Sequence, residues 1–336
     1  MIFITGSTGL VGAHVLLKLL QDGQSVRALK RETSKLSIVH GIFKHYNQEK
    51  LFENINWVNG DILDILSLKE NLEGCQKVIH CAATVSFDSS DYSLLMKNNI
   101  EGTANIVNAC IEHDVKKLAY VSSIATLGSQ KTKQEKTEES YFESNNSNTQ
   151  YAISKYMAEQ EVWRGIQEGL PAVIVNPSVI LGPGDWSKGS AQLFEKVWNG
   201  LKFYTSGSTG YVDVLDVSSI LVTLLNSEIS NQRFIINAEN LEYKTVFDWI
   251  AEDLNRPKAF IKVTPLIKEI AWRLEWLKSI ITSKKPLLTK ETANKSMKKN
   301  YYSNKKISQA LSYKFIPIRE SVRNYSQWFL SEKTNP

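Results

Sequence analysis

At 336 residues the chain is long enough for one large domain, or for a domain with a smaller one attached. Hydrophobic residues make up 42% and charged residues 22%, as in ordinary globular proteins, and no apolar run approaches the roughly 20 residues that span a bilayer. The three cysteines and five histidines lack metal-ligand spacing, and the opening MIFITG shows no secretory signal pattern. We therefore expect a reduced, cytoplasmic protein with no metal site.

The net charge of +5 is unevenly distributed. Residues 258–336 contain 17 Lys and Arg against 5 Asp and Glu, so the remainder of the chain is acidic. A solvated basic surface, an anionic substrate and an acidic membrane surface all fit this pattern. We do not expect a nucleic-acid partner, because no recognised binding motif accompanies the charge.

Short apolar runs alternate with helical patterns through the first half of the chain. Helices are expected near residues 10–22, 62–73, 92–113 and 150–168, and the expected strands read MIFIT, SVRAL, NWVN, KVIHCA, KLAYVSS and AVIVNP. Such alternation predicts an α/β protein with a Rossmann-type, doubly wound parallel sheet covered by helices on both faces.

The strict alternation fades after Pro177, where the stretches LGPGDWSKGS and TSGSTG appear. We expect a smaller, discontinuous substrate-binding domain to begin there, built from residues 178–210 and 229–336. The dinucleotide-binding domain would comprise residues 1–177 and about 211–228, the latter as a strand and helix returning to the sheet. Residues 129–150 are polar and predict a surface loop.

The first expected strand runs into TGSTGLVG, residues 5–12, directly before an amphipathic helix. The glycines of this G-x-x-G-x-x-G pattern allow a tight turn and a close approach to a pyrophosphate, which sits on the amides of the helix N-terminus. The stretch therefore predicts a dinucleotide site that includes Gly6, Thr8, Gly9, Leu10, Val11 and Gly12.

Basic residues follow the second expected strand, where an acidic residue would favour NAD. Lys30, Arg31 and Lys35 suit a 2′-phosphate and indicate NADP. Glu32 lies beside them, so NAD and a merely solvated basic loop remain the alternatives. After the third strand, Asp61 and Ile62 would meet the adenine, with Asp61 accepting a hydrogen bond from its amino group.

YAISK, residues 151–155, places Tyr151 and Lys155 one helical turn apart on one face. The pattern is common by chance, so it fits ordinary helix surface as well as an acid–base couple. Ser123 ends a strand in the adjacent unit of the expected sheet. All three residues would then lie at the carboxyl edge of the sheet, where such folds bind ligands.

Taken in order, TGSTGLVG, GDIL, HCAA, NNIEGT, VSS and YAISK resemble the extended short-chain dehydrogenase/reductase family. Within it, the chain is similar to the branch of dihydroflavonol reductases and 3β-hydroxysteroid dehydrogenases. The resemblance implies that Tyr151 is the catalytic acid–base and that Lys155 binds the nicotinamide ribose and lowers the pKa of Tyr151. It further implies that Ser123 orients the substrate oxygen and that Asn99 supports the site.

The same resemblance implies further contacts with the cofactor. The ribose would be lined by His80, Cys81, Ala82 and Ala83, and the nicotinamide by Asn176, Pro177, Ser178 and Val179. Many relatives have Arg before this proline where the present chain has Asn176, so substrate contacts there do not transfer.

An NADP-dependent oxidoreductase is the first functional expectation, interconverting a hydroxyl and a carbonyl on an apolar or partly aromatic small molecule. One alternative is a nucleotide-sugar epimerase or dehydratase, which uses NAD(P) transiently. The other is a non-catalytic NAD(P)-binding sensor or scaffold, against which the intact Ser123, Tyr151 and Lys155 argue. The resemblance also implies a homodimer formed through the helices near 92–113 and 150–168.

The stretch TPLIKEIAWRLEWLKSII, residues 264–281, predicts an amphipathic helix. Trp272 and Trp276 lie nearly opposite its apolar stripe. Their indole rings could therefore pack in the core or contact a substrate, another subunit or a membrane interface. Lysines follow the helix, and a basic amphipathic helix that bears tryptophans is also compatible with peripheral contact with an anionic membrane. The stripe expected to face the core consists of Leu266, Ile270, Leu274, Leu277 and Ile281.

Overall fold

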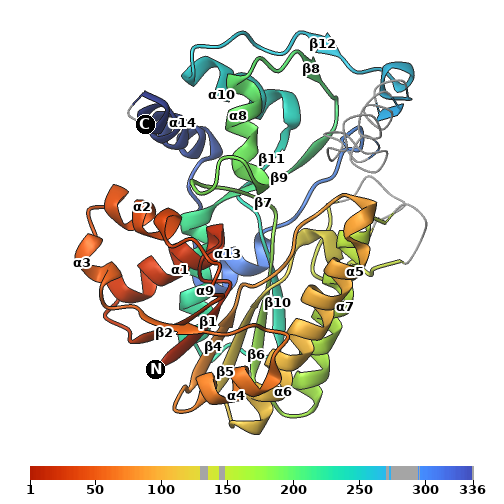
Figure 1. The fold of residues 1–336 in the computed structure, drawn as a ribbon. Helices are drawn as coiled ribbons and strands as arrows, with labels where there is room; N and C mark the ends of the chain where they lie inside the picture. Colours follow the sequence, from red (N-terminus) through yellow and green to blue (C-terminus); the bar gives the residue numbers. More distant parts are fainter. Residues whose placement is uncertain (129–134, 144–147, 270–271, 274–293, 295, 335–336) are drawn as a thin grey trace.

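The computed structural model describes residues 1–128, 135–143, 148–269, 272–273, 294 and 296–334 (Figure 1). Within them, seven parallel strands form one sheet in the order β10-β6-β5-β4-β1-β2-β3. The strands are β1 (Ile2–Thr5), β2 (Val26–Lys30), β3 (Asn56–Asn59), β4 (Lys77–His80), β5 (Lys117–Val121), β6 (Ala172–Pro177) and β10 (Gln232–Ile236). The predicted doubly wound α/β fold is confirmed.

Side chains alternate between the two faces of this sheet, and both faces are buried, as expected for parallel strands. Ile2 and Ile4 pack with one group of helices, whereas Phe3 between them packs with the other. Figure 1 shows the two helical layers on either side of the sheet. The first layer contains α1 (Leu10–Gln21), α2 (Ser37–His45), α3 (Glu49–Phe52) and α9 (Val214–Asn226), and the second α4 (Ile65–Leu72), α6 (Gly102–Glu112) and α7 (Gln150–Gln167).

The helix expected near residues 92–113 is interrupted. It consists of α5 (Tyr92–Leu95), a π-helical segment (Met96–Glu101) and α6. π-Helical turns inside α-helices occur frequently at functional sites, because the extra residue re-aims a side chain. Asn99 lies in this segment, so the interruption positions one of the predicted site residues.

The strand expected to return to the large sheet near residue 211 does not do so. It is β9 (Ser208–Asp213), which pairs instead with β7 (Val179–Leu181) and β11 (Glu239–Glu242) in a separate sheet. The helix that follows, α9, does return and packs on α1. The last strand of the large sheet is β10, because Phe234 and Ile236 extend the core beside β6.

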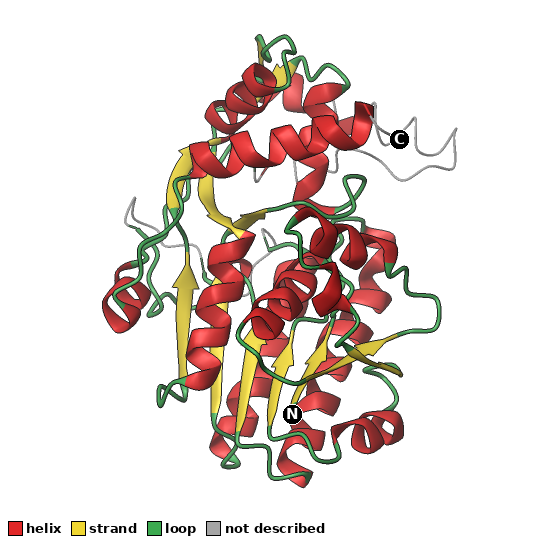
Figure 2. Cartoon of the chain, turned by 90° about the vertical axis from the view of Figure 1, so that its left-hand side faces the viewer, coloured by secondary structure: helices red, strands yellow, loops and turns green. Residues whose placement is uncertain are grey.

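The remaining elements form the smaller lobe above the carboxyl edge of the large sheet (Figure 2). They are α8 (Gln192–Trp198), β8 (Phe203–Tyr204), α10 (Tyr243–Asp253), β12 (Ile261–Lys262) and α14 (Ile318–Thr334), whereas α13 (Lys305–Leu311) packs on β10 of the large sheet. Helix α14 packs on α10 and buries Val322 and Phe329 in the same core as α1 and α9. The C-terminal segment therefore closes the structure over the first helical layer.

The helix predicted at residues 264–281 lies mostly outside the described residues, including Ile270, Leu274, Trp276, Leu277 and Ile281. Leu266 was expected to face the core, and this prediction is wrong. Leu266 is 71% exposed, within the described helical residues 265–269. In the part of the chain that the structure describes, no helix has the length and apolarity needed to cross a membrane.

Candidate active site

The glycine turn between β1 and α1 is shaped by backbone contacts that exclude side chains. Gly6 has φ of 68°, and a Cβ on it would lie 2.5 Å from the amide nitrogen of Ala82. A Cβ on Gly12 would lie 2.2 Å from the carbonyl oxygen of Gly6. Helix α1 begins after Gly9 without a side-chain cap, so its first amides face outward and can receive an anion.

Polar atoms left without partners also fit a bound dinucleotide. Among the described residues, Ser178 Oγ and Asn176 Oδ1 are buried and have no hydrogen-bond partner. Asn176 is near the end of β6 and Ser178 directly follows the strand, at the same carboxyl edge as the glycine turn. Together with the cradle at Gly6 and Gly12, these atoms fit the NAD(P) predicted here.

The structure places two of the predicted adenosine-side residues, Lys30 and Asp61, at neighbouring strand ends. The amide of Gly60 donates to the carbonyl of Lys30 (3.0 Å), which places Asp61 beside the end of β2. Lys30 Nζ donates to Asn59 Oδ1 at 2.6 Å. Arg31 and Lys35 are exposed, and neither forms an ion pair with another described residue. These two cations are the ones free to meet a phosphate.

Ser123 lies in the turn after β5, and Tyr151 lies next to it in the first turn of α7. Ser123 Oγ accepts a hydrogen bond from the amide of Ala125 (3.1 Å) in the turn after β5. The Ser123 hydroxyl also lies near enough to the Tyr151 phenol to lower its pKa against the larger, raising effect of burial. Thr149 caps α7 by accepting from Ala152 N (3.1 Å), which fixes the first turn that carries Tyr151.

Lys155 lies fully buried one turn further along α7. Its Nζ donates to Tyr120 Oη at 2.7 Å and to the carbonyl of Val121 at 2.9 Å. These bonds use two of the three ammonium donors. Burial lowers the pKa of Lys155 to about 7, although the negative charge of Glu159 opposes this effect.

The pKa of Tyr151 differs from the sequence-based expectation. Burial raises it, and the Ser123 hydroxyl only partly offsets this. A lowering by Lys155 was expected, but the Lys155 ammonium is directed to Tyr120 and Val121 instead. In this arrangement Tyr151 holds its proton at neutral pH, which suits a proton donor.

A buried polar chain continues beneath Lys155. Tyr120 stacks on the ring of His80 with centroids 5.4 Å apart. His80 is hydrogen-bonded to Thr5 Oγ1 (2.6 Å) and Thr103 Oγ1 (3.0 Å), and burial lowers its pKa to about 3. His80 was expected to line the cofactor ribose, but its ring is enclosed here within the fold. The following residues, Cys81 and Ala82, provide the backbone that meets Gly6.

Asn99 connects the π-helical segment to the loop after β4. Its Oδ1 accepts from the amide of Thr84 (2.7 Å), and its Nδ2 donates to Thr84 O (3.0 Å) and Ser154 Oγ (2.9 Å). Ser154 immediately precedes Lys155. Asn99 therefore ties the loop at residue 84 to helix α7, consistent with the supporting position expected for it.

Several residues near the site were missed from the sequence. The ring of Phe87 contacts Tyr151 edge-on at 5.7 Å, and Phe87 is 40% exposed, which gives the site an apolar wall. Tyr120 and Glu159 were also missed. Glu159 follows Lys155 by one helical turn, and this spacing on one face was the available signal.

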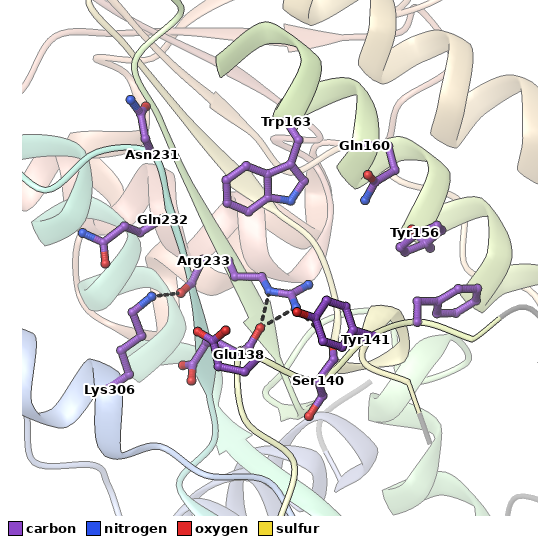
Figure 3. A pocket seen from close by; sticks show the side chains of 12 residues that line it. Glu138, Ser140, Tyr141, Tyr156, Gln160, Trp163, Asn231, Gln232, Arg233 and Lys306 are labelled. Carbon is purple, nitrogen blue, oxygen red and sulfur yellow. Dashed lines mark hydrogen bonds between the residues drawn. The ribbon is translucent and has the colours of Figure 1, made fainter. Parts of the chain in front are cut away.

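The structure also has a surface cavity of about 470 Å³ (Figure 3). It is bordered by Trp163 and Tyr156 on α7, by Arg233 on β10, and by the chain around Ser140. Ser123, Tyr151 and Lys155 do not line it. Within the described residues, no group of three or more His, Cys, Asp or Glu could hold a metal ion.

The parallel sheet, its glycine turn and the Ser123–Tyr151–Lys155 arrangement define a dinucleotide-binding α/β protein with its site at the carboxyl edge. Residues 2–237 match the family model described as the NAD-dependent epimerase/dehydratase family, and the chain belongs to this family. It is therefore an NAD(P)-dependent enzyme of the extended short-chain dehydrogenase/reductase type, as the motifs indicated.

Three named relatives match most of the chain, and two of them have reductase names. A Synechocystis protein provisionally named a dihydroflavonol 4-reductase is 28% identical over 97% of this chain and 94% of its own. Sterol demethylase protein B of Methylococcus capsulatus is 25% identical over 89% and 86%. Cinnamoyl-CoA reductase 1 of Petunia hybrida is 26% identical over 69% and 71%.

Solved structures share the whole fold. The crystal structure of gox2253 has a TM-score of 0.82 and 28% identity, covering 99% of this chain and 98% of its own. A UDP-glucose 4-epimerase of Thermotoga maritima has a TM-score of 0.77 at 19% identity, covering 98% and 99%. The second similarity concerns the fold alone.

Proposed function

We propose that the protein is an NADP-dependent reductase that interconverts a carbonyl and a hydroxyl on an apolar or partly aromatic small molecule. The observation that carries the proposal is that Ser123 and Tyr151 lie next to each other, with Lys155 buried one helical turn further along α7 and bonded to the end of β5. A phenol beside a hydroxyl can hold a carbonyl oxygen from two sides. The reductase names of relatives along most of the chain favour this reading.

The residues have separate roles in the proposed reaction. Bound NADPH supplies the hydride that reaches the carbonyl carbon. Ser123 donates a hydrogen bond to the carbonyl oxygen and orients it, and Tyr151 gives that oxygen its proton. Lys155 places a positive charge behind the site, which stabilises the phenolate that Tyr151 becomes.

The surroundings of Tyr151 favour an apolar substrate over a sugar. Phe87 presents its ring edge to Tyr151, and Val85 on the same loop is also largely exposed. Apolar walls with a few placed polar groups are typical of small-molecule sites. An aromatic or terpenoid carbonyl compound would bury its rings against this loop, whereas a nucleotide sugar would leave its hydroxyls unpaired there.

Turnover with a panel of carbonyl compounds tests the proposal. Purified protein is given NADPH with a dihydroflavonol, a cinnamaldehyde, a 3-ketosteroid or UDP-glucose, and absorbance at the reduced nicotinamide band is followed. We expect net oxidation of NADPH with one of the first three. Conversion of UDP-glucose without net oxidation would instead establish the epimerase alternative, and binding of NADPH without any turnover would favour the non-catalytic sensor.

The choice of NADP over NAD gives a second prediction. Arg31→Glu replaces an exposed cation by a carboxylate, so it should repel a 2′-phosphate and accept bonds from a 2′-hydroxyl. We expect the preference for NADPH over NADH, as a ratio of kcat/KM, to fall by about ten- to hundredfold, the worth of a charged hydrogen bond. Lys50→Glu on α3 makes the same charge change at an exposed position. An unchanged ratio in Arg31→Glu would exclude a phosphate contact at residue 31.

A homodimer formed through α5, α6 and α7, and contact of the basic C-terminal part with a membrane, stay predictions. Tyr92, Leu94 and Met157 are large exposed side chains on α5 and α7, which supports a partner on these helices. Location in the cytoplasm is proposed on the cysteine content alone.

A further inference from the structure

Glu159 is a buried carboxylate to which the proposed reaction gives no role. It is fully buried on α7, one turn after Lys155. Its Oε2 accepts hydrogen bonds from Ser122 Oγ (2.6 Å), Thr126 Oγ1 (2.9 Å) and Asn176 Nδ2 (2.8 Å). Burial of a carboxylate costs free energy unless several donors surround it, and Glu159 has such a set of donors.

The donors on the Oε2 side hold the turn that carries Ser123. Asn176 Nδ2 also donates to the carbonyl of Ser123 (3.2 Å). Thr126 Oγ1 lies 2.9 Å from the same carbonyl, so its single proton is shared between that carbonyl and Glu159. Ser122 lies beside Ser123 in the chain. Glu159 thus fixes both sides of the serine through groups that do not themselves touch a substrate.

The other oxygen of Glu159 faces Arg233 of β10. Arg233 Nη1 donates to Oε1 at 3.0 Å, and Trp163 Nε1 donates to it at 3.4 Å. The guanidinium also bonds the carbonyls of Glu138 and Ser140, through Nε to Glu138 O at 2.9 Å and Nη2 to Ser140 O at 3.1 Å (Figure 3). Arg233 therefore links Glu159 to the chain around residue 138.

These carbonyls belong to residues 135–143. We call these residues the bridging segment because they lie between Ser123 and Tyr151 in the sequence. Glu138 secures it further by accepting from the amide of Ile235 (2.8 Å). A Cβ on Gly128 would lie 1.5 Å from Tyr141 O, so the segment runs directly against the backbone that leaves the serine turn.

We propose that Glu159 is a positioning residue that couples the bridging segment to the turn of Ser123, through Arg233 on one side and Ser122, Thr126 and Asn176 on the other. The inference rests on the proposed function, since it assigns Ser123 its place in the reaction. With the segment docked, Ser123 and Tyr151 are held in the geometry that receives a carbonyl oxygen. With the segment released, the serine turn loses its support from behind.

Glu159→Gln tests the link between the serine turn and the bridging segment, because it removes the charge and one of the two acceptor oxygens that join them. Arg233 and Trp163 can only donate, whereas the hydroxyls of Ser122 and Thr126 can turn to accept, so the glutamine oxygen faces Arg233 and its amide nitrogen faces the serine turn. That nitrogen meets Asn176 Nδ2, which is also a donor, so the turn of Ser123 is held less firmly, and the uncharged oxygen holds Arg233 and the bridging segment less tightly than a carboxylate does. We expect kcat to fall by about tenfold or more, as small misplacements of reacting groups do, while the Kd for NADPH is unchanged. Glu161→Gln, which alters a partly buried ion pair with Arg164 on the same helix, is the matched control and should leave kcat unchanged.

The pH profile distinguishes this from a purely structural defect. Lys155 is faced by Tyr120 of β5, by His80 and Cys81 at the end of β4, and by Tyr151 and Glu159 of its own helix. The charge of Glu159 raises the pKa of Lys155 against the larger effect of burial. Without this charge, Lys155 becomes neutral at a lower pH. The loss of reduction rate on the alkaline side should therefore move to lower pH in Glu159→Gln but not in Glu161→Gln.

Amide hydrogen exchange gives a readout that needs no turnover. In Glu159→Gln we expect faster exchange in both residues 122–128 and residues 135–143. Faster exchange in only one of the two, or kcat and pH profile like those of the wild type, would overturn the coupling. If the wild type reduces no carbonyl compound, the proposed function fails, and the exchange result still decides the coupling.

Arg233→Lys keeps the positive charge opposite Glu159 but cannot bond both carbonyls of the bridging segment. It serves as the test if Glu159→Gln does not fold. We expect faster exchange in both stretches and a lowered kcat with NADPH affinity retained. Wild-type exchange in either stretch in this variant would contradict the proposal.

Discussion

Tyr151→Phe is expected to lower kcat for carbonyl reduction by about 10²–10⁴-fold, the usual contribution of a positioned general acid. The change removes the proton that the substrate oxygen receives. Because burial raises the pKa of Tyr151, this proton is present throughout the neutral range, and water would replace it poorly at an apolar site. Steady-state kinetics with the substrate identified from the carbonyl panel, at saturating NADPH, measure the effect.

The phenylalanine ring should leave the rest of the site in place. It preserves the edge contact with Phe87, so NADPH binding, followed by nicotinamide fluorescence, should be unchanged. Tyr156→Phe is the matched control, since Tyr156 lies on the same helix and stacks on Phe142 at 4.3 Å, away from Ser123. Equal losses in both variants would point to the helix rather than to the proton, and a fully active Tyr151→Phe would remove Tyr151 from the mechanism.

Much of the fold could be predicted from local patterns. Strands such as β1 and β6 are buried on both faces and therefore read as continuous apolar runs, and the helices between them have clear periodicity. The pairing of β9 could not be predicted in this way. An apolar strand followed by a helix fits either sheet, and only the partners across space decide between β6 and β7.

The site was predictable where its residues recur as ordered motifs and not where it depends on distant pairing. Gly6, Ser123, Tyr151 and Lys155 stand in motifs, and the structure brings the last three together. The π-helical turn at Asn99 and the direction of the Lys155 ammonium toward Tyr120 follow from packing that no local pattern records. Arg233 reaches Glu159 across 74 positions of the chain, so a lone arginine in a strand gave no sign of its role.

The glycine turn gives the prediction with the largest expected effect on cofactor binding. Gly12→Ala puts a methyl group 2.2 Å from Gly6 O and 2.8 Å from Ser7 Cα, both backbone atoms that cannot rotate away. In a helix, alanine is ordinarily favoured over glycine by about 1 kcal/mol. Here the overlap exceeds a full ångström, and overpacking of this kind costs about 1–3 kcal/mol, so we expect a net loss of stability.

The larger consequence is for the dinucleotide. To relieve the overlap, α1 must move away from the turn at Gly6, and its first amides then no longer converge on the pyrophosphate. We expect the Kd for NADPH to rise by about tenfold or more, since each lost hydrogen bond to a charged group is worth about 1.5–3 kcal/mol. Isothermal titration with NADPH and urea unfolding measure the two effects separately.

Gly41→Ala supplies the comparison, because Gly41 also lies within a helix, α2, and a Cβ there meets nothing within 4 Å. This variant should be slightly more stable than the wild type and should bind NADPH equally well. If Gly12→Ala behaved in the same way, the close approach of α1 to the turn would not be needed for binding. The cradle at Gly6 and Gly12 would then be a consequence of helix packing alone, and the exposed amides after Gly9 would have to hold the pyrophosphate without it.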